Sequence, residues 1–377
     1  MKKMLKYLSP LAPDQSGAAG VLYELGGIIV ICDAGGCAGN ICGFDEPRWF
    51  SKRSAVFSAG LRDMDAIMGR DDRLIEKLSK AYEQIGGEFA AIVATPVPAV
   101  IGTDMKALKR MAEKKLGIPC ITVNAIGTRL FDEGEEEAWL GLFREFAGKG
   151  NDASHIENDA SHNTQSVTGI LGATPLETGY STSEPLIEMA KAYGIENPLI
   201  YGMGSGLEAI REIGRIKENL VVTPAGLKTA RYLEEECGVP YKVGYPFTPQ
   251  DVKKQVLDSI ERLLSKGKES ATRVLIIHTQ FAANELRSLI LNKYPDISID
   301  VATFFMQSPD YKEEGDVRLS GEDDLAELVA ARNYDLVVAD GDIERLLTAV
   351  GYKNTFVDYP SFAVSGRMND DSVMFFS

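Results

Sequence analysis

The sequence contains no long apolar run. Nothing in it approaches the roughly 18 consecutive apolar residues of a membrane-spanning helix. The first residues, MKKMLKYLSP, do not form a signal peptide, because Lys6 and the Ser9-Pro10 pair interrupt the apolar stretch that such a peptide needs. These absences predict a cytoplasmic protein without a membrane partner.

Positive charge is also scarce, since 40 Lys and Arg residues stand against 55 Asp and Glu residues, for a net charge of −15. A protein this acidic is repelled by a phosphate backbone, so no nucleic-acid partner is expected. The five cysteines are odd in number, and with no signal peptide they are expected to be reduced thiols or metal ligands. No Ser-His-Asp order, Walker loop or zinc-binding spacing is recognisable.

What the sequence does contain is a repeated alternation of short apolar runs with amphipathic helices. Uninterrupted apolar runs are typical of parallel strands that are covered on both faces of a sheet. The runs that predict strands are residues 26–36, 89–97, 118–127, 167–173, 197–202, 219–224, 272–279, 297–305, 334–340 and 354–360. Helical spacing is clearest at 71–85, 103–116 and 251–269. The pattern predicts an α/β protein with parallel sheets.

The alternation restarts twice, and a chain of 377 residues is too long for one ordinary core. We therefore expect three Rossmann-like domains, at residues 1–150, 166–270 and 271–377. Residues 151–165 form a polar linker that contains the sequence NDASH twice. The alternative for this linker is a weak metal site formed by His155 and His162.

Three cysteines follow the first predicted strand with the spacing C-x4-C-x4-C, at Cys32, Cys37 and Cys42. Glycine and alanine between them let the backbone fold closely around a compact group, and thiolates near backbone N–H groups are good soft ligands. An iron–sulfur cluster needs four thiolates, so a fourth ligand would have to come from elsewhere or from another chain. The alternative is that Cys32 is a buried strand residue and that the other two have no special role.

Two further loops should lie at the carboxyl edge of the first sheet, where open α/β sheets bind ligands. Residues 44–50, FDEPRWF, form either a docking surface or active-site rim, or a packed turn anchored by Trp49. Residues 94–104 contain two prolines and lead into a helix that Thr103 is expected to cap. The backbone N–H groups of this second loop could face an anion or a cluster.

Two other features have both a functional and a structural interpretation. Residues 202–207, GMGSGL, resemble a dinucleotide-binding turn, but Leu207 stands where Gly or Ala is needed and no acidic residue ends the next strand. No NAD is therefore expected, and a tight turn is favoured. His278 ends a strand, which suits either proton transfer or a hydrogen-bonded structural role.

Taken together, these pieces resemble the nitrogenase component 1 family, which includes the nitrogenase MoFe-protein subunits and related protochlorophyllide and tetrapyrrole reductases. The stretches that carry the resemblance are GAAG at 17–20, CD at 32–33, SAVFSAGL at 54–61, TPVPAVIGTD at 95–104, IKENL at 216–220, GVP at 238–240, YP at 245–246, DLVVAD at 335–340 and DYP at 358–360. The resemblance implies three Rossmann-like domains with parallel sheets around a central cleft. Family members place cluster cysteines at three positions, of which only Cys32 matches here, because Ala18 or Ala19 and Pro96 occupy the other two.

The resemblance implies an anaerobic-type oxidoreductase subunit that pairs with a homologous component 1 subunit, as a homodimer or heterodimer. Such a subunit would receive electrons from an ATP-dependent iron-protein-like reductase and reduce a substrate, possibly a tetrapyrrole, in the cleft. Its cofactor would be a 4Fe–4S type cluster relocated to Cys32, Cys37 and Cys42, or shared between subunits. The alternative is a non-catalytic scaffold that holds a metal cluster or tetrapyrrole during cofactor assembly. A plain α/β ligand-binding protein is a third possibility.

Overall fold

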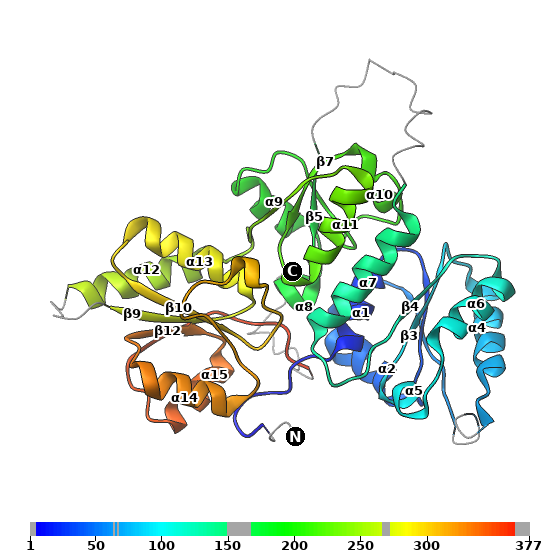
Figure 1. Cartoon of the computed structure of the whole chain (residues 1–377), viewed down its shortest axis with the longest axis horizontal. Coiled ribbons are helices and arrows are strands. Elements are labelled where there is room, and N and C mark those ends of the chain that lie inside the picture. The colour runs from blue at the N-terminus through cyan, green and yellow to red at the C-terminus, as the bar shows by residue number, and fades with distance from the viewer. Residues whose placement is uncertain (1–4, 63–64, 66–67, 149–166, 266–271, 366–377) are drawn as a thin grey trace, which may run out of the picture. The chain divides into compact units, whose positions relative to one another are not determined.

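Three separate β-sheets organise the chain (Figure 1). The computed structural model describes residues 5–365 apart from 63–64, 66–67, 149–166 and 266–271. His155 and His162, and with them the suggested metal site in the polar linker, lie outside the described residues. Among the residues described, no helix is long and apolar enough to cross a membrane.

The first sheet has the strand order β2-β1-β3-β4, and all its pairs are parallel. Its strands are β1 (Ile28–Ile31), β2 (Ala55–Ser58), β3 (Ala90–Val93) and β4 (Cys120–Val123). The apolar runs predicted around β1, β3 and β4 are confirmed as strands, and all four residues of β1 and of β3 are buried.

The second sheet has the order β6-β5-β7-β8, in which β5 runs parallel to both neighbours. The third has the order β11-β10-β9-β12-β13 and is parallel throughout. The strands of the second sheet are β5 (Val167–Leu171), β6 (Pro198–Ile200), β7 (Ile216–Val221) and β8 (Tyr241–Val243). Those of the third are β9 (Arg273–Ile277), β10 (Ser298–Thr303), β11 (Val317–Arg318), β12 (Leu336–Ala339) and β13 (Thr355–Asp358). The predicted α/β class with parallel sheets is confirmed.

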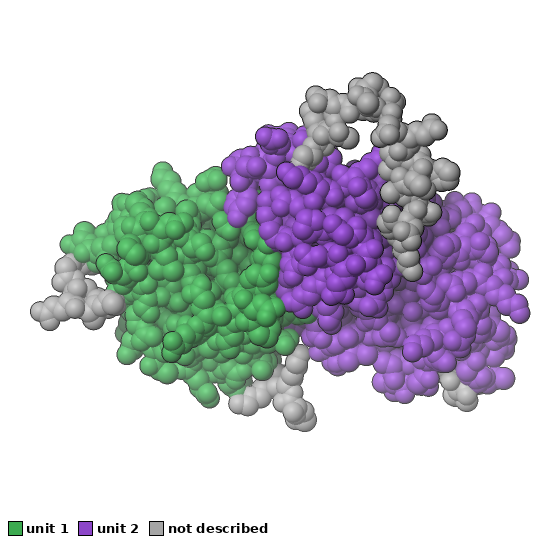
Figure 2. Space-filling view, turned by 45° about the horizontal axis from the view of Figure 1, so that its top comes forward, with its two compact units in different colours: residues 1–10, 222–224, 243–362 green, residues 11–221, 225–242, 363–377 purple. Residues whose placement is uncertain are grey.

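The chain divides into two compact units, which Figure 2 colours separately. One unit, residues 11–221, 225–242 and 363–377, contains the first two sheets, and the other, residues 1–10, 222–224 and 243–362, contains the third. In this second unit the carboxylate of Glu322 accepts hydrogen bonds from the backbone N–H groups of Lys6, Tyr7 and Leu8, at 2.9, 2.8 and 2.7 Å. The three-domain boundaries at 150, 165 and 270 stay a prediction.

Amphipathic helices cover the sheets. In the unit with the first two sheets these are α4 (Asp71–Ile85), α6 (Met105–Leu116), α7 (Phe131–Phe146), α9 (Glu184–Ala192) and α11 (Leu227–Cys237). The shorter helices there are α2 (Gly36–Asn40), α5 (Pro96–Ile101), α8 (Pro175–Thr178) and α10 (Glu208–Arg211). The third sheet carries α12 (Gln250–Leu264) and α13 (Gln280–Lys293) on one face and α14 (Glu322–Arg332) and α15 (Gly341–Ala349) on the other (Figure 1). Helix α4 matches its predicted bounds because Leu74, Ile75 and Leu78 recur on one buried face.

Two expectations about residues 94–104 are wrong. Instead of an open loop, the stretch forms α5, in which Pro96 and Pro98 occupy the first turn, where their missing N–H groups cost nothing. The cap of the following helix α6 is Asp104 and not Thr103, because the Asp104 carboxylate accepts from the backbone N–H groups of Lys106 and Ala107.

Helix α1 (Asp14–Leu22) packs directly on α7. Every residue of α1 is buried, and small residues let the two backbones meet. A Cβ on Gly17 would lie 1.9 Å from the Phe131 carbonyl oxygen, and one on Gly134 would lie 1.8 Å from that of Asp14. Gly17, at the start of the GAAG stretch, is therefore a point of close backbone contact with α7.

Candidate functional site

Of the three cysteines that follow β1, Cys37 and Cys42 lie on short helical turns. Cys32 comes directly after the strand, Cys37 lies in α2, and Cys42 lies in a π-helical turn at Ile41–Asp45. The expectation of an open glycine-rich loop is wrong for residues 36–45. The turn into α2 is possible because Gly35 adopts φ of +124°, a conformation that other residues rarely reach.

The thiols differ in how far they are buried. Cys32 is 2% exposed and belongs to the apolar core of the first sheet. Burial, together with the nearby carboxylates of Asp71 and Asp33, raises the pKa of Cys32 to about 12. Cys37 and Cys42 are half-buried, and burial combined with neighbouring carboxylates raises the pKa of each, to about 11 for Cys42. All three are thus protonated thiols at neutral pH.

Asp33 organises this edge of the sheet. Its side chain is fully buried and accepts hydrogen bonds from the Ala38 backbone N–H at 2.8 Å and from the Ser58 hydroxyl at 2.6 Å. The hydroxyl of Thr95 donates to the Cys32 carbonyl at 2.9 Å, so the start of α5 is tied to the end of β1. These bonds fix the backbone around the thiols without using the sulfur atoms of Cys32 or Cys42.

A complete set of metal ligands is not gathered here. Among the residues that the structure describes, no three His, Cys, Asp or Glu side chains lie together so that they could hold a metal ion. An iron–sulfur cluster needs four thiolates, and the described residues do not bring four together. The assignment of Cys32, Cys37 and Cys42 as its ligands stays a prediction.

Several apolar side chains are exposed on the connections at the same end of the first sheet as the half-buried thiols. They lie in the connections that leave the carboxyl ends of β2, β3 and β4, and beside Cys42. Val100 is the most exposed, at 85%. The others are Phe44, Met68, Ile101 and Ile126. Single exposed apolar residues are ordinary, but several on the loops of one sheet edge mark an interaction surface.

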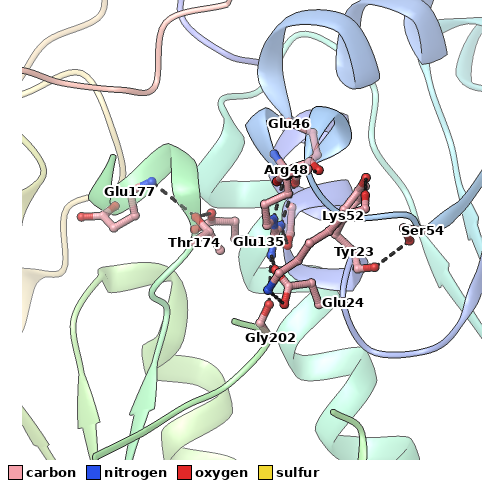
Figure 3. A network of polar contacts seen from close by, with 12 residues as sticks. Tyr23, Glu24, Glu46, Arg48, Lys52, Ser54, Glu135, Thr174, Glu177 and Gly202 are labelled. Carbon is pink, nitrogen blue, oxygen red and sulfur yellow. Dashed lines mark hydrogen bonds and ion pairs between the residues drawn. The ribbon is translucent and has the colours of Figure 1, made fainter. Parts of the chain in front are cut away.

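The segment at residues 44–50 is held in place by Arg48, whose side chain is fully buried (Figure 3). Its guanidinium donates to both carboxylate oxygens of Glu46 at 2.7 Å, and to the carbonyl oxygens of Gly20 at 2.6 Å and Gly202 at 3.0 Å. A further bond of 3.2 Å reaches Glu24 at the end of α1. Arg48 therefore ties α1 to the turn that follows β6 of the second sheet.

The sequence suggested Trp49 as the anchor of this turn, and that suggestion is wrong. Trp49 is 41% exposed and Phe50 is 73% exposed, whereas Arg48 is buried. The Arg48 guanidinium also lies 4.9 Å from the centre of the Tyr23 ring. The prediction that the segment is a docking surface or rim is untested, and its exposed aromatic side chains suit that use.

The glycine-rich stretch at 202–207 is a tight turn. Gly202 and Gly204 have φ of +73° and +70°, and α10, which follows, is only four residues long. The N–H of Gly204 donates to the Glu24 carboxylate at 3.1 Å. A side chain of the protein thus takes the amide that would face a phosphate in a nucleotide-binding turn.

His278 is a satisfied buried residue. Its Nε2 lies 3.1 Å from the Pro360 carbonyl oxygen, which can only accept, and its Nδ1 lies 3.2 Å from the Thr279 hydroxyl. Its ring stacks on Tyr359 with the centroids 4.0 Å apart. Burial lowers the pKa of His278 to about 4, so the ring is neutral and this geometry favours the structural role over proton transfer.

Stability should therefore fall in mild acid. Below pH 6.5 the unfolded chain protonates His278 while the folded chain does not, so the stabilisation present above that pH is lost as the pH falls toward 4. We expect a loss of about 3 kcal/mol between pH 7 and pH 4 that is absent from the variant His278→Asn, measured by urea unfolding. If the wild type and His278→Asn lost the same free energy of unfolding between pH 7 and pH 4, His278 would not be a buried neutral residue.

The sequence is similar to a known protein family and to curated members of it. Residues 16–294 match the family model described as nitrogenase component 1 type oxidoreductase. The nitrogenase iron-molybdenum cofactor biosynthesis protein NifE of Rhizobium meliloti is 37% identical over 75 residues, which are 19% of this chain and 15% of that protein. NifE of Mesorhizobium japonicum is 24% identical over 227 residues, which are 57% of this chain and 42% of that protein. The matches thus span less than half the length of these relatives.

Two solved structures of nitrogenase Cp1 share the fold. The one at pH 6.5 has a TM-score of 0.65 with 12% identity, covering 98% of this chain and 89% of that chain. The one at pH 5 has a TM-score of 0.64 with 13% identity, covering 97% and 86%.

Proposed function

Because this chain belongs to the nitrogenase component 1 type oxidoreductase family, we propose that it is a scaffold subunit for metal–sulfur clusters. It holds a cluster as cargo at the carboxyl edge of the first sheet, between itself and a second subunit of the same type. The observation that carries this proposal is the pair of half-buried thiols Cys37 and Cys42 after β1, in a sheet whose other connections expose apolar side chains.

The thiols suit transient binding better than a permanent site. Cys37 and Cys42 are reachable from outside, but burial and the carboxylates of Asp33 and Glu46 raise the pKa of Cys42 and keep it protonated until a metal displaces the proton. A ligand that must lose a proton binds its metal less tightly at neutral pH, which favours release. A scaffold must release its cluster in order to pass it to another protein.

The surface around the thiols suits a second subunit. Val100 and Ile101 on α5 and Ile126 after β4 expose apolar area on connections that follow the carboxyl ends of β3 and β4, in the sheet whose strand β1 leads to the thiols. A subunit that covers this area would exclude water and could add the missing thiolates. The similarity to cofactor biosynthesis proteins over 57% of the chain supports an assembly role.

Anaerobic reconstitution with ferrous iron and sulfide tests the proposal. The wild-type protein should bind iron and sulfide, while Cys37→Ser and Cys42→Ser should each weaken the affinity for iron by about tenfold or more, since even the loss of a residue that hydrogen-bonds a metal ligand weakens affinity by that much. The matched control is Cys237→Ser, a half-buried thiol at the end of α11, which should bind iron like the wild type. Full iron binding by the double variant at Cys37 and Cys42 would contradict the proposal.

A redox enzyme subunit is the second candidate, and membership of an oxidoreductase family favours it. In that case the bound cluster would accept electrons from an ATP-dependent iron–sulfur reductase and would stay bound through reduction and reoxidation. Transfer of the reconstituted iron to an acceptor protein without turnover of any substrate would favour the scaffold instead.

A further inference from the structure

Glu135 on α7 is a fully buried acid whose carboxylate is only half satisfied. Its Oε1 accepts a hydrogen bond from the Thr174 hydroxyl. Its Oε2 has no hydrogen-bond partner among the described residues. Figure 3 shows the Glu135 side chain between Thr174 and Arg48. An ionised carboxylate in such a place would keep an unsatisfied buried charge, which costs several kcal/mol.

The Thr174 hydrogen bond and the positive charge of Arg48 both favour the ionised form of Glu135, but burial has the larger effect and Arg48 makes its own bonds elsewhere. Arg48 is committed to Glu46, with two bonds of 2.7 Å, and to Glu24. The other acidic groups that act on Glu135 are Glu177 of α8 and Asp132 of α7, and both disfavour a further negative charge. Burial is the largest effect, and together these influences raise the pKa of Glu135 well above 4.5.

Three further charged residues on elements that pack against α7 have partners other than Glu135. On α1, Asp14 bonds to Arg129 at 3.0 Å. On α11, Lys228 pairs with Glu136, and on α10, Arg211 pairs with Glu88 at 2.6 Å. The salt bridge of Lys228 uses the neighbouring residue of α7 and does not involve Glu135.

We propose that Glu135 is a proton-binding site of the folded protein and that its neutral carboxylic acid joins α7 to α8. The link runs through Thr174, whose hydroxyl oxygen also caps α8 by accepting from the Glu177 N–H at 3.3 Å. Thr174 follows β5 in the chain, so the bond joins α7 to the segment that leaves the carboxyl end of that strand. This inference does not depend on the proposed scaffold function.

The proposal predicts that the protein takes up a proton when it folds near neutral pH. The unfolded carboxyl ionises near pH 4.5 and the folded one at a higher pH, so the stability seen below pH 4.5 is lost as the pH rises toward the folded value. The variant Glu135→Gln has the same shape and cannot ionise. Between pH 5 and pH 8, the folding equilibrium constant of the wild type should fall relative to that of Glu135→Gln by up to about tenfold per pH unit.

Urea unfolding of the wild type and Glu135→Gln between pH 5 and pH 8 measures the ratio of their folding equilibrium constants. The matched control is Glu136→Gln, the next residue on α7, whose carboxylate is paired with Lys228 and partly exposed. It should show the same pH slope as the wild type. A constant ratio between wild type and Glu135→Gln would overturn the proposal.

Infrared spectroscopy of the wild type gives an independent answer even if Glu135→Gln does not fold. A protonated buried carboxyl should give a carbonyl band at pH 7 that shifts in heavy water. Absence of this band from the folded protein would overturn the proposal.

Discussion

Replacing Arg48 with Met should lower the free energy of unfolding by about 3–5 kcal/mol. The guanidinium is fully buried, and it is bonded to both oxygens of Glu46 and to the carbonyls of Gly20 and Gly202. Its removal leaves the Glu46 carboxylate, 2% exposed, without its cation. The loss would be measured by urea unfolding followed by circular dichroism.

Arg211→Met is the matched control for this change. Arg211 also pairs with a carboxylate, Glu88, at 2.6 Å, but the two side chains are 40% and 48% exposed. Such a surface pair contributes at most about 1 kcal/mol. If Arg48→Met cost no more than this control, Arg48 would not be the brace that joins α1 to the turn after β6.

Gly17→Ala should also be strongly destabilising, by about 3 kcal/mol. The added methyl group would lie 1.9 Å from the Phe131 carbonyl oxygen and 2.6 Å from its carbon. Both atoms belong to the backbone of α7, so no side chain can rotate away and the two helices must separate. Thermal or urea unfolding of the variant measures the cost.

Gly20→Ala, on the same helix, is the control. A Cβ there meets only the Glu46 Oε2, at 3.9 Å. Alanine favours a helix over glycine by up to about 1 kcal/mol, so this variant should be as stable as the wild type or slightly more stable. A similar loss in both variants would show that α1 is sensitive to any substitution and that its contact with α7 is not the cause.

The parts of the fold that the sequence predicts are those with a strong hydrophobic period. Helix α4 has its predicted bounds, and the apolar runs of β3 and β9 are strands. Strand β2 was not predicted, because it is a four-residue edge strand that is only partly buried and has no clear alternation. The predicted helix at 251–269 ends as α12 at Leu264, and residues 266–271 lie outside the described part.

Less of the candidate site could be predicted from the sequence. The spacing of Cys32, Cys37 and Cys42 indicated a shared place after β1, and the structure puts them on consecutive turns there. It could not indicate that Cys32 is buried in the core while the other two are half-buried. The glycine and alanine between the thiols predicted a loop, whereas residues 36–45 form helical turns and the Ala38 N–H donates to Asp33.

The polar network around Arg48 and Glu135 was missed altogether. Arg48 and Gly202 are 154 residues apart, and Glu135 and Thr174 are 39 apart, so no local motif joins them. The only local signal is an arginine between Pro47 and Trp49, which is as typical of an exposed turn as of a buried brace. Such contacts depend on tertiary packing and need the folded coordinates.

The most direct test of the scaffold proposal is the iron and acid-labile sulfide content of protein isolated without oxygen, measured together with its molecular mass in solution. The proposal predicts iron and sulfide on a species of two or more subunits, and neither on the variant that lacks the thiols of Cys32, Cys37 and Cys42. A cluster bound by a single chain, or one that persists in that variant, would contradict it.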